Sequence, residues 1–138
     1  MVSMPVDGPE VNVFEAVGGL PWFVALVERF YVGVADDPIL RPLYPEDLSG
    51  SITHTAGFLA QYWGGGTAMY SDDRGHPRLR MRHAPFVIGQ AERDAWLGHM
   101  VEAIKGGGLS PELEQRMIDY FDMASTHMIN DSPLTLRP

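Results

Sequence analysis

The chain of 138 residues contains no cysteine, and this absence excludes several kinds of site. Without a thiol there can be no disulfide, no thiolate metal ligand, no iron–sulfur cluster and no catalytic cysteine. Basic residues are also scarce, with ten lysines and arginines against eighteen acidic residues and a net charge of −8. Nucleic-acid binding needs a broad basic face, so this charge argues against a nucleic-acid partner.

Long hydrophobic runs are missing as well. No apolar stretch approaches the roughly 18 residues that a membrane span requires. Residues 1–12 have neither the basic start nor the apolar centre of a signal peptide. We therefore expect a cytoplasmic protein with no membrane span. Internal repeats, period-two strand patterns, nucleotide-binding glycine motifs and the HExxH zinc motif are absent too.

The chain does contain apolar residues at the three- and four-residue spacing of helices. This spacing, together with glycine and proline breaks, predicts helices over residues 13–17, 21–35, 38–43, 48–63, 78–83, 90–105 and 111–130. Residues 67–77 read as a long loop. The length suits one domain. We expect an all-α domain over residues 13–131, a flexible N-terminal extension over residues 1–12 and a flexible tail over residues 132–138.

An arginine-rich stretch stands out in the middle of this acidic chain. It runs Arg74-Gly75-His76-Pro77-Arg78-Leu79-Arg80-Met81-Arg82-His83-Ala84-Pro85-Phe86. A neutral imidazole beside a positive field would suit a flat dianionic ligand whose metal takes one nitrogen, and haem is such a ligand. The alternative is that the arginines form a solvated face and that the histidine is structural. The stretch alone does not decide between them.

Several linked motifs decide it, and through them the chain resembles the truncated haemoglobins, more narrowly group II. The resemblance covers nearly the whole chain, from about residue 13 to residue 131. The motifs, in order and at compatible spacing, are Ala16-Val17-Gly18-Gly19, Arg29-Phe30-Tyr31, Leu43-Tyr44-Pro45-Glu46-Asp47, Gln61-Tyr62-Trp63-Gly64-Gly65, the arginine-rich stretch, and Glu92-Arg93-Asp94-Ala95-Trp96-Leu97. The resemblance implies a truncated globin-like two-over-two helical sandwich that binds haem b.

The resemblance also implies which residues surround the cofactor. His83 falls on the position of the proximal iron ligand. Tyr31, Tyr44 and Trp96 fall on the polar distal side, where they are candidates for a catalytic role. The remaining residues expected at the cofactor are Phe30, Leu43, Leu48, Ser51, His54, Thr55, Phe58, Tyr70, His76, Arg80, Phe86 and Met100.

Two features depart from the family pattern. The turn at Tyr44 is one residue shorter, which shifts the register expected for the following helix. Thr55 stands where members often carry leucine or glutamine, so the room and hydrogen bonding at that place differ. Ser51 and Thr55 are hydroxyl residues on an otherwise apolar stripe, and such hydroxyls can equally bond back to the helix backbone.

The other four histidines are weaker candidates for the iron ligand. His54 points aside from the stripe and is expected at the propionate edge or in solvent. His76 precedes a proline, so capping the turn is as good an interpretation as a cofactor contact. His99 is expected at the surface, and His127 is ambiguous.

One haem has two carboxylates, so not every arginine of the stretch can bind one. Arg80 lies three residues before His83, and we expect it to reach a propionate, shared with Tyr70 and His54. Arg78 and Arg82 are expected to be solvated.

Tyr31, Tyr44 and Trp96, the distal trio, would determine how the bound ligand reacts. The two phenols and the indole can donate hydrogen bonds to a ligand that carries partial negative charge, and ligand release would then be slow. Slow release suits redox chemistry, such as nitric oxide oxidation or peroxide reduction, with an unidentified reductase. Reversible storage or sensing of dioxygen is the alternative, and a haem-free helical protein is a third class. Dioxygen, nitric oxide and carbon monoxide are the expected ligands, and a homodimer is possible.

Overall fold

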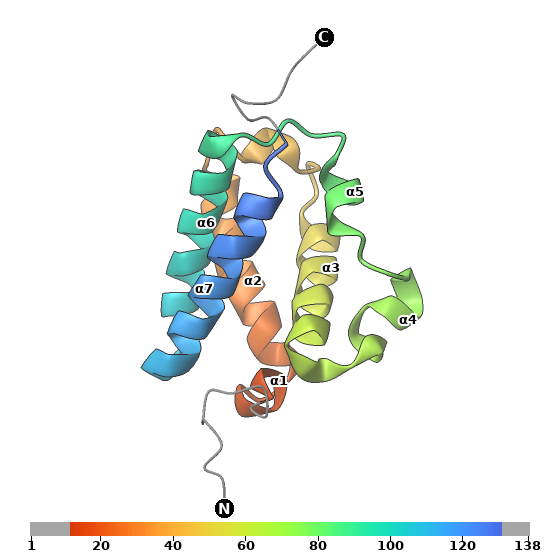
Figure 1. Cartoon of the computed structure of the whole chain (residues 1–138), viewed down its shortest axis with the longest axis vertical. Helices are drawn as coiled ribbons and strands as arrows, with labels where there is room; N and C mark the ends of the chain where they lie inside the picture. Colours follow the sequence, from red (N-terminus) through yellow and green to blue (C-terminus); the bar gives the residue numbers. More distant parts are fainter. Residues whose placement is uncertain (1–11, 131–138) are drawn as a thin grey trace, which may run out of the picture.

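The computed structural model describes residues 12–130, which form an all-helical fold without a β-strand (Figure 1). Four long helices make up most of it: α2 (Leu20–Ala35), α3 (Ser49–Ala60), α6 (Gln90–Lys105) and α7 (Pro111–His127). Shorter elements connect them: α1 (Val13–Ala16), η1 (Arg41–Leu43), the π-helical turn η2 (Gln61–Gly65), η3 (Thr67–Met69), α4 (Ser71–Arg74) and α5 (Leu79–His83). The all-α prediction is confirmed. Of the predicted extension only Asn12 is described, as the N-cap of α1, and the predicted tail lies outside the described residues.

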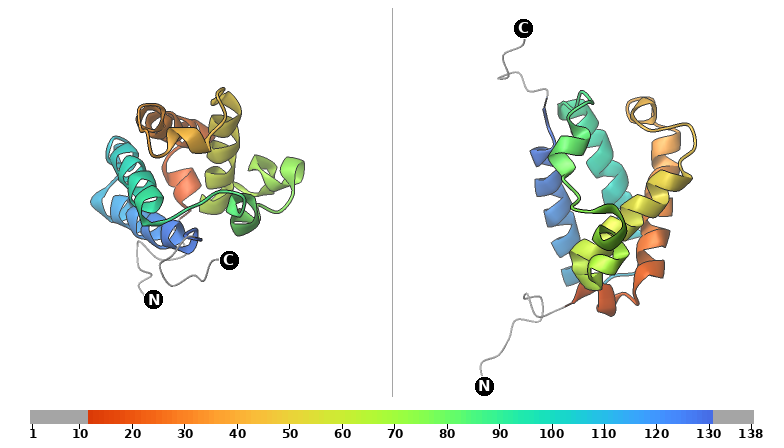
Figure 2. Two further views of the ribbon diagram at one scale, coloured as in Figure 1. Left: turned by 90° about the horizontal axis from the view of Figure 1, so that it is seen from above. Right: turned by 90° about the vertical axis from the view of Figure 1, so that its right-hand side faces the viewer.

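The long helices are arranged as two pairs. Helix α2 packs against α3, α6 packs against α7, and contacts between α2 and α6 join the two pairs (Figures 1 and 2). The core between them is apolar, and its burial is the main favourable contribution to folding. Its largest fully buried side chains include Phe23, Leu26, Phe30, Leu40, Met100, Ile104 and Met117. Among the described residues, no helix is long and apolar enough to cross a membrane.

At the start of each of the two C-terminal helices, a side-chain oxygen accepts a hydrogen bond from a backbone N–H group that has no partner within the helix. The Glu92 carboxylate accepts a hydrogen bond from the Gly89 backbone N–H at 2.8 Å, which fixes the start of α6. The Ser110 hydroxyl accepts from the Leu113 N–H at 3.3 Å, and Pro111 follows as the first helical residue of α7. These local signals are visible in the sequence, and both helices start where it predicts.

The segment after α3 differs from its prediction. The regular helix ends at Ala60, and η2 follows it to Gly65 and includes Gly64, whose φ of +117° only glycine adopts easily. Residues 67–77 were expected to form a loop, but they contain η3 and α4. The reason is a long-range anchor: the Gln61 amide accepts from the Ser71 backbone N–H and donates to its hydroxyl, both at 2.8 Å.

The expectation that His99 lies at the surface is wrong. Its Nε2 pairs with the Asp37 carboxylate at 2.7 Å, and only 29% of its side chain is exposed. The ring packs so closely on Gly33 of α2 that a β-carbon at this glycine would overlap it. The predicted helix over residues 38–43 is also shorter in the structure, where only Arg41–Leu43 form a 3₁₀ turn.

Candidate functional site

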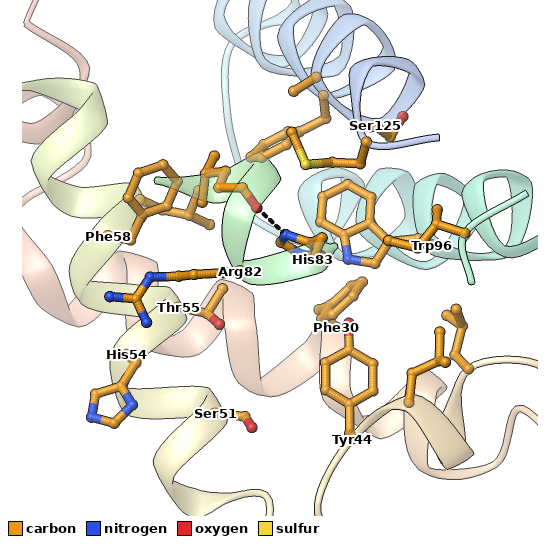
Figure 3. Close-up of a pocket in the computed structure, with 18 of the residues that line it drawn as sticks. Phe30, Tyr44, Ser51, His54, Thr55, Phe58, Arg82, His83, Trp96 and Ser125 are labelled. Atoms are coloured by element: carbon orange, nitrogen blue, oxygen red, sulfur yellow. Dashed lines mark hydrogen bonds between the residues drawn. The ribbon is translucent and has the colours of Figure 1, made fainter. Parts of the chain in front are cut away.

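A cavity of about 380 Å³ lies between the two helix pairs and is closed on one side by α5 (Figure 3). Five helices that are far apart in the sequence contribute residues to its wall, namely α2, α3, α5, α6 and α7. Most of the residues expected around a cofactor line it, namely Phe30, Tyr31, Leu43, Tyr44, Ser51, His54, Thr55, Phe58, Tyr70, His83 and Trp96. The fold therefore gathers these residues around one space.

Four expected residues do not line this cavity. Met100 is fully buried in the helical core, and Leu48 packs against that core from its edge. Phe86 is 41% exposed on the loop after α5. The exposed His76 accepts a hydrogen bond from the Arg78 backbone N–H at 3.1 Å, which is the turn role considered for it. The side chain of a fifth expected residue, Arg80, lies outside what the structure describes.

His83 ends α5 and presents its imidazole to the cavity. Its Nδ1 lies 2.6 Å from the Leu79 carbonyl oxygen, as the dashed line in Figure 3 shows. A carbonyl can only accept, so Nδ1 must carry the proton. In the neutral ring this leaves the Nε2 lone pair available, and a hydrogen bond of this kind typically orients a metal-binding histidine. His83 is thus prepared to hold a metal through Nε2.

Three polar aromatic side chains lie together in the wall made by α2, α6 and the segment after η1. The rings of Tyr31 and Tyr44 meet edge to face at 5.4 Å between centroids. The Tyr31 hydroxyl lies 3.4 Å from the Thr55 hydroxyl. Phe30 packs between Tyr31 and Trp96 at 5.0 and 5.3 Å. The expected trio therefore comes from three separate segments to one side of the cavity.

Burial makes both phenols of this trio harder to ionise. It raises the pKa of Tyr31, although hydrogen bonds with Thr55, Ser51 and Tyr44 act the other way. Burial also raises the pKa of Tyr44, and the nearby Tyr31 raises it further. At neutral pH both O–H groups are therefore available as hydrogen-bond donors.

Cationic and polar groups gather at the mouth of the cavity. The Arg74 guanidinium donates to His54 Nε2 at 3.0 Å and lies 5.6 Å from the centre of the Tyr70 ring. Arg82, expected to be solvated, is exposed but also lines the cavity, and its Nε donates to the Pro77 carbonyl at 2.6 Å. Arg74 opens the arginine-rich stretch but was not selected from the sequence. Two arginines in a chain of charge −8 make this mouth locally positive.

The sequence interpretation missed the side of the cavity that faces α7. Residues that line it there are Tyr120, Phe121, Ala124, Ser125 and Met128, and Leu79, Ile88, Glu92 and Arg93 lie nearby. In the sequence the α7 residues form an ordinary apolar stripe, which predicts a core helix. Only Ser125, a buried hydroxyl on that stripe, could have signalled that this face borders a site.

The donor set fits a haem. The cavity is largely apolar, it offers one imidazole nitrogen for an iron, and it has arginines at its mouth for two carboxylates. On the side of Tyr31, Tyr44 and Trp96 it offers O–H and N–H donors rather than a second metal ligand. Among the described residues, no cluster of three or more histidine, cysteine or acidic side chains could hold a metal ion.

Comparison with known proteins agrees with this geometry. The family model "Bacterial-like globin" matches residues 12–130. The chain is 37% identical over 119 residues to a group 2 truncated haemoglobin of Bacillus subtilis, covering 86% of this chain and 89% of that one. A thermostable haemoglobin of Thermobifida fusca superposes with a TM-score of 0.82 at 50% identity, covering 87% and 98% of the two chains. A truncated oxygen-avid haemoglobin of Bacillus subtilis gives 0.80 at 37% identity, covering 87% and 100%.

Proposed function

The chain belongs to the bacterial-like globin family and is a group II truncated haemoglobin, and from that membership we propose that it uses haem b, held by His83, for redox chemistry on a diatomic ligand. The family's cofactor is haem and its ligands are diatomic gases such as dioxygen. Bound haem supplies an iron with one coordination position open to such a gas. The particular ligand residues and the redox activity are our proposal.

One observation carries the assignment of the iron ligand. The Leu79 carbonyl holds the proton on Nδ1 of His83, so in the neutral ring Nε2 carries the lone pair, and the ring lines the cavity. The carbonyl also fixes the rotation of the ring. We propose Arg74 and Arg82, with His54 and Tyr70, for the propionate edge, because these side chains line the mouth. The proposal that Arg80 reaches a propionate still depends on the sequence alone.

The residues on the opposite side support tight holding of a ligand. Tyr31, Tyr44 and Trp96 are neutral donors in a largely apolar cavity, and such donors strengthen when the acceptor carries partial charge. Release would then be slow, and one similar protein is itself described as oxygen-avid. Slow release favours redox turnover over transport. Turnover needs electrons, so we propose a separate reductase as a partner. From the sequence we also propose a cytoplasmic location and possible homodimer formation.

Haem titration followed by absorption spectroscopy tests the proposal. The chain should bind one haem, and the ferrous form should show an iron–histidine stretching vibration by resonance Raman. In His83→Ala this vibration should disappear, and haem affinity should fall at least about tenfold, a typical effect of a lost ligand contact. His76→Ala is the matched control, because His76 belongs to the same stretch but does not line the cavity. An unchanged vibration in His83→Ala would end the assignment.

Turnover separates the redox proposal from the alternative. Nitric oxide consumption by the oxygenated protein with an electron donor present, or peroxide reduction, should proceed catalytically. Reversible oxygen binding without turnover in either assay would instead identify a storage or sensing protein.

A further inference from the structure

Asn130, just beyond the end of α7, is bonded to the loop that follows His83. Its side-chain N–H₂ group donates to the Phe86 carbonyl at 2.9 Å and to the His83 carbonyl at 3.4 Å. Its side-chain oxygen accepts from the Ile88 backbone N–H at 2.8 Å, and its own backbone N–H donates to the Ile88 carbonyl at 2.8 Å. These partners fix the orientation of the amide, because a carbonyl cannot donate and a backbone N–H cannot accept.

The segment that Asn130 holds has few other attachments. Helix α5 spans only Leu79–His83, and so short a helix has little stability of its own. Ala84, Pro85, Phe86 and Val87, which follow it, are exposed. Within the described part of the chain, the long-range hydrogen bonds of residues 83–88 all involve Asn130.

We propose that Asn130 is a positioning residue for the proximal histidine. Leu79 fixes the rotation of the His83 ring, while Asn130 fixes the backbone from which the ring projects. The end of α7, which also forms one wall of the cavity through Met128, thereby sets where the imidazole stands. This inference depends on the proposed role of His83 as the iron ligand.

Asn130→Asp tests the donor half of this contact. The aspartate keeps the shape and the acceptor for Ile88, but it presents an oxygen instead of N–H₂ to the His83 and Phe86 carbonyls. We expect the iron–histidine vibration to shift and broaden in the ferrous protein. Haem transfer to an excess of apomyoglobin should be about tenfold or more faster, as for other lost hydrogen bonds around metal ligands. Asn130→Ala should show both changes more strongly.

Asn12→Ala is the matched control. Asn12 is also an asparagine with bonds from both ends of its amide, to the Gly64 carbonyl and from the Glu15 N–H, but it lies at α1, away from His83. It should destabilise the fold without moving the vibration. Circular dichroism of each variant verifies folding, and Asn130→Asp serves where Asn130→Ala does not fold.

The outcomes separate the two proposals. A wild-type protein without the iron–histidine vibration would overturn the role of His83, and the role of Asn130 with it. A normal wild-type vibration that is unchanged in folded Asn130→Asp, with an unchanged haem-transfer rate, would overturn the positioning role alone. A shift equal to that of Asn12→Ala would also overturn it, since loss of stability would then explain the effect.

Discussion

Trp96 is the residue at which packing and hydrogen bonding can best be separated. Its indole packs against Phe30 and Phe121, with ring centroids 5.3 and 5.8 Å away, and it also carries an N–H group that can donate a hydrogen bond. A phenylalanine in its place would retain most of the packing but no N–H group. The two contributions therefore predict different results for the same substitution.

We expect Trp96→Phe to keep the fold and haem binding, because most of the buried area remains. Dioxygen should nevertheless leave faster, since a hydrogen bond to a charged acceptor contributes about 1.5–3 kcal/mol. At about 1.4 kcal/mol per factor of ten, this is roughly a tenfold to hundredfold increase in the release rate. Stopped-flow measurement of dissociation and association gives both rates.

Tyr31→Phe is the companion variant. It should act in the same direction, and the double variant should be non-additive if both donors contact one ligand. A changed association rate with an unaltered dissociation rate in Trp96→Phe would reject the donor role. The indole would then act as a steric gate.

At the scale of elements, a glycine brings two segments of the cavity wall together. Gly57 of α3 lies against the backbone of η3, where an added β-carbon would stand 2.5 Å from the Met69 carbonyl oxygen. Tyr70, which lines the cavity, follows that carbonyl directly. Displacing that carbonyl would therefore also displace the backbone of Tyr70.

Gly57→Ala should destabilise the protein by about 1–3 kcal/mol, the usual cost of overpacking a tight contact. Gly98→Ala is the control, since nothing lies within 4 Å of a β-carbon at that position of α6. Gly98→Ala should stabilise the protein by roughly 0.5–1 kcal/mol, because glycine in a helix interior is less favourable than alanine. Urea unfolding measures both, and similar effects of the two substitutions would contradict the close contact.

Elements were predictable from the sequence where their signals are local. Helix α6 begins at Gln90 and ends at Lys105, as its apolar spacing and the following glycines indicate. Elements fixed by distant partners were not predictable. Helix α4 begins at Ser71, which makes two hydrogen bonds with Gln61, ten residues earlier. No local sequence pattern predicts these hydrogen bonds.

The same distinction between local and distant signals applies to the residues of the candidate site. Residues of the expected motifs, such as Tyr31 and His83, were found because resemblance to a family names positions. Ser125 and Arg74 were missed, because their importance follows from facing a cavity and not from a pattern in the chain. Likewise, His99 looks like a surface residue until its partner, 62 positions earlier, is known.

At the scale of the whole molecule, the pair of Asp37 and His99 joins the end of α2 to α6 and so links the two helix pairs. The hydrogen bond from His99 is the main reason that the pKa of Asp37 lies below its ordinary value of 3.8, with a further bond from the Ile39 N–H. A lowered folded-state pKa means that folding favours the ionised carboxyl. Its contribution to stability is therefore present above the ordinary value and lost as the pH falls through the folded value.

Asp37→Asn should consequently be less stable than wild type at pH 6, and the difference in unfolding free energy should shrink below about pH 4. Urea unfolding over a series of pH values measures this difference. Asp36→Asn removes a neighbouring exposed carboxylate as a control and should change the unfolding free energy at pH 6 only slightly. A difference for Asp37→Asn that stays constant down to pH 3 would contradict the link.

The positions of the three tryptophans should make the fluorescence of the protein sensitive to what fills the cavity. Trp96 lines the cavity, whereas Trp63 is separated from it by Tyr120, whose ring it meets at 5.4 Å. Trp22 does not line the cavity, and its indole N–H donates to the Gly107 carbonyl at 2.9 Å. A coloured group in the cavity quenches indole fluorescence more strongly the nearer the indole is. The chain thus contains one emitter at the cavity and two outside its lining, and their separate lifetimes would report filling of the cavity without any added dye.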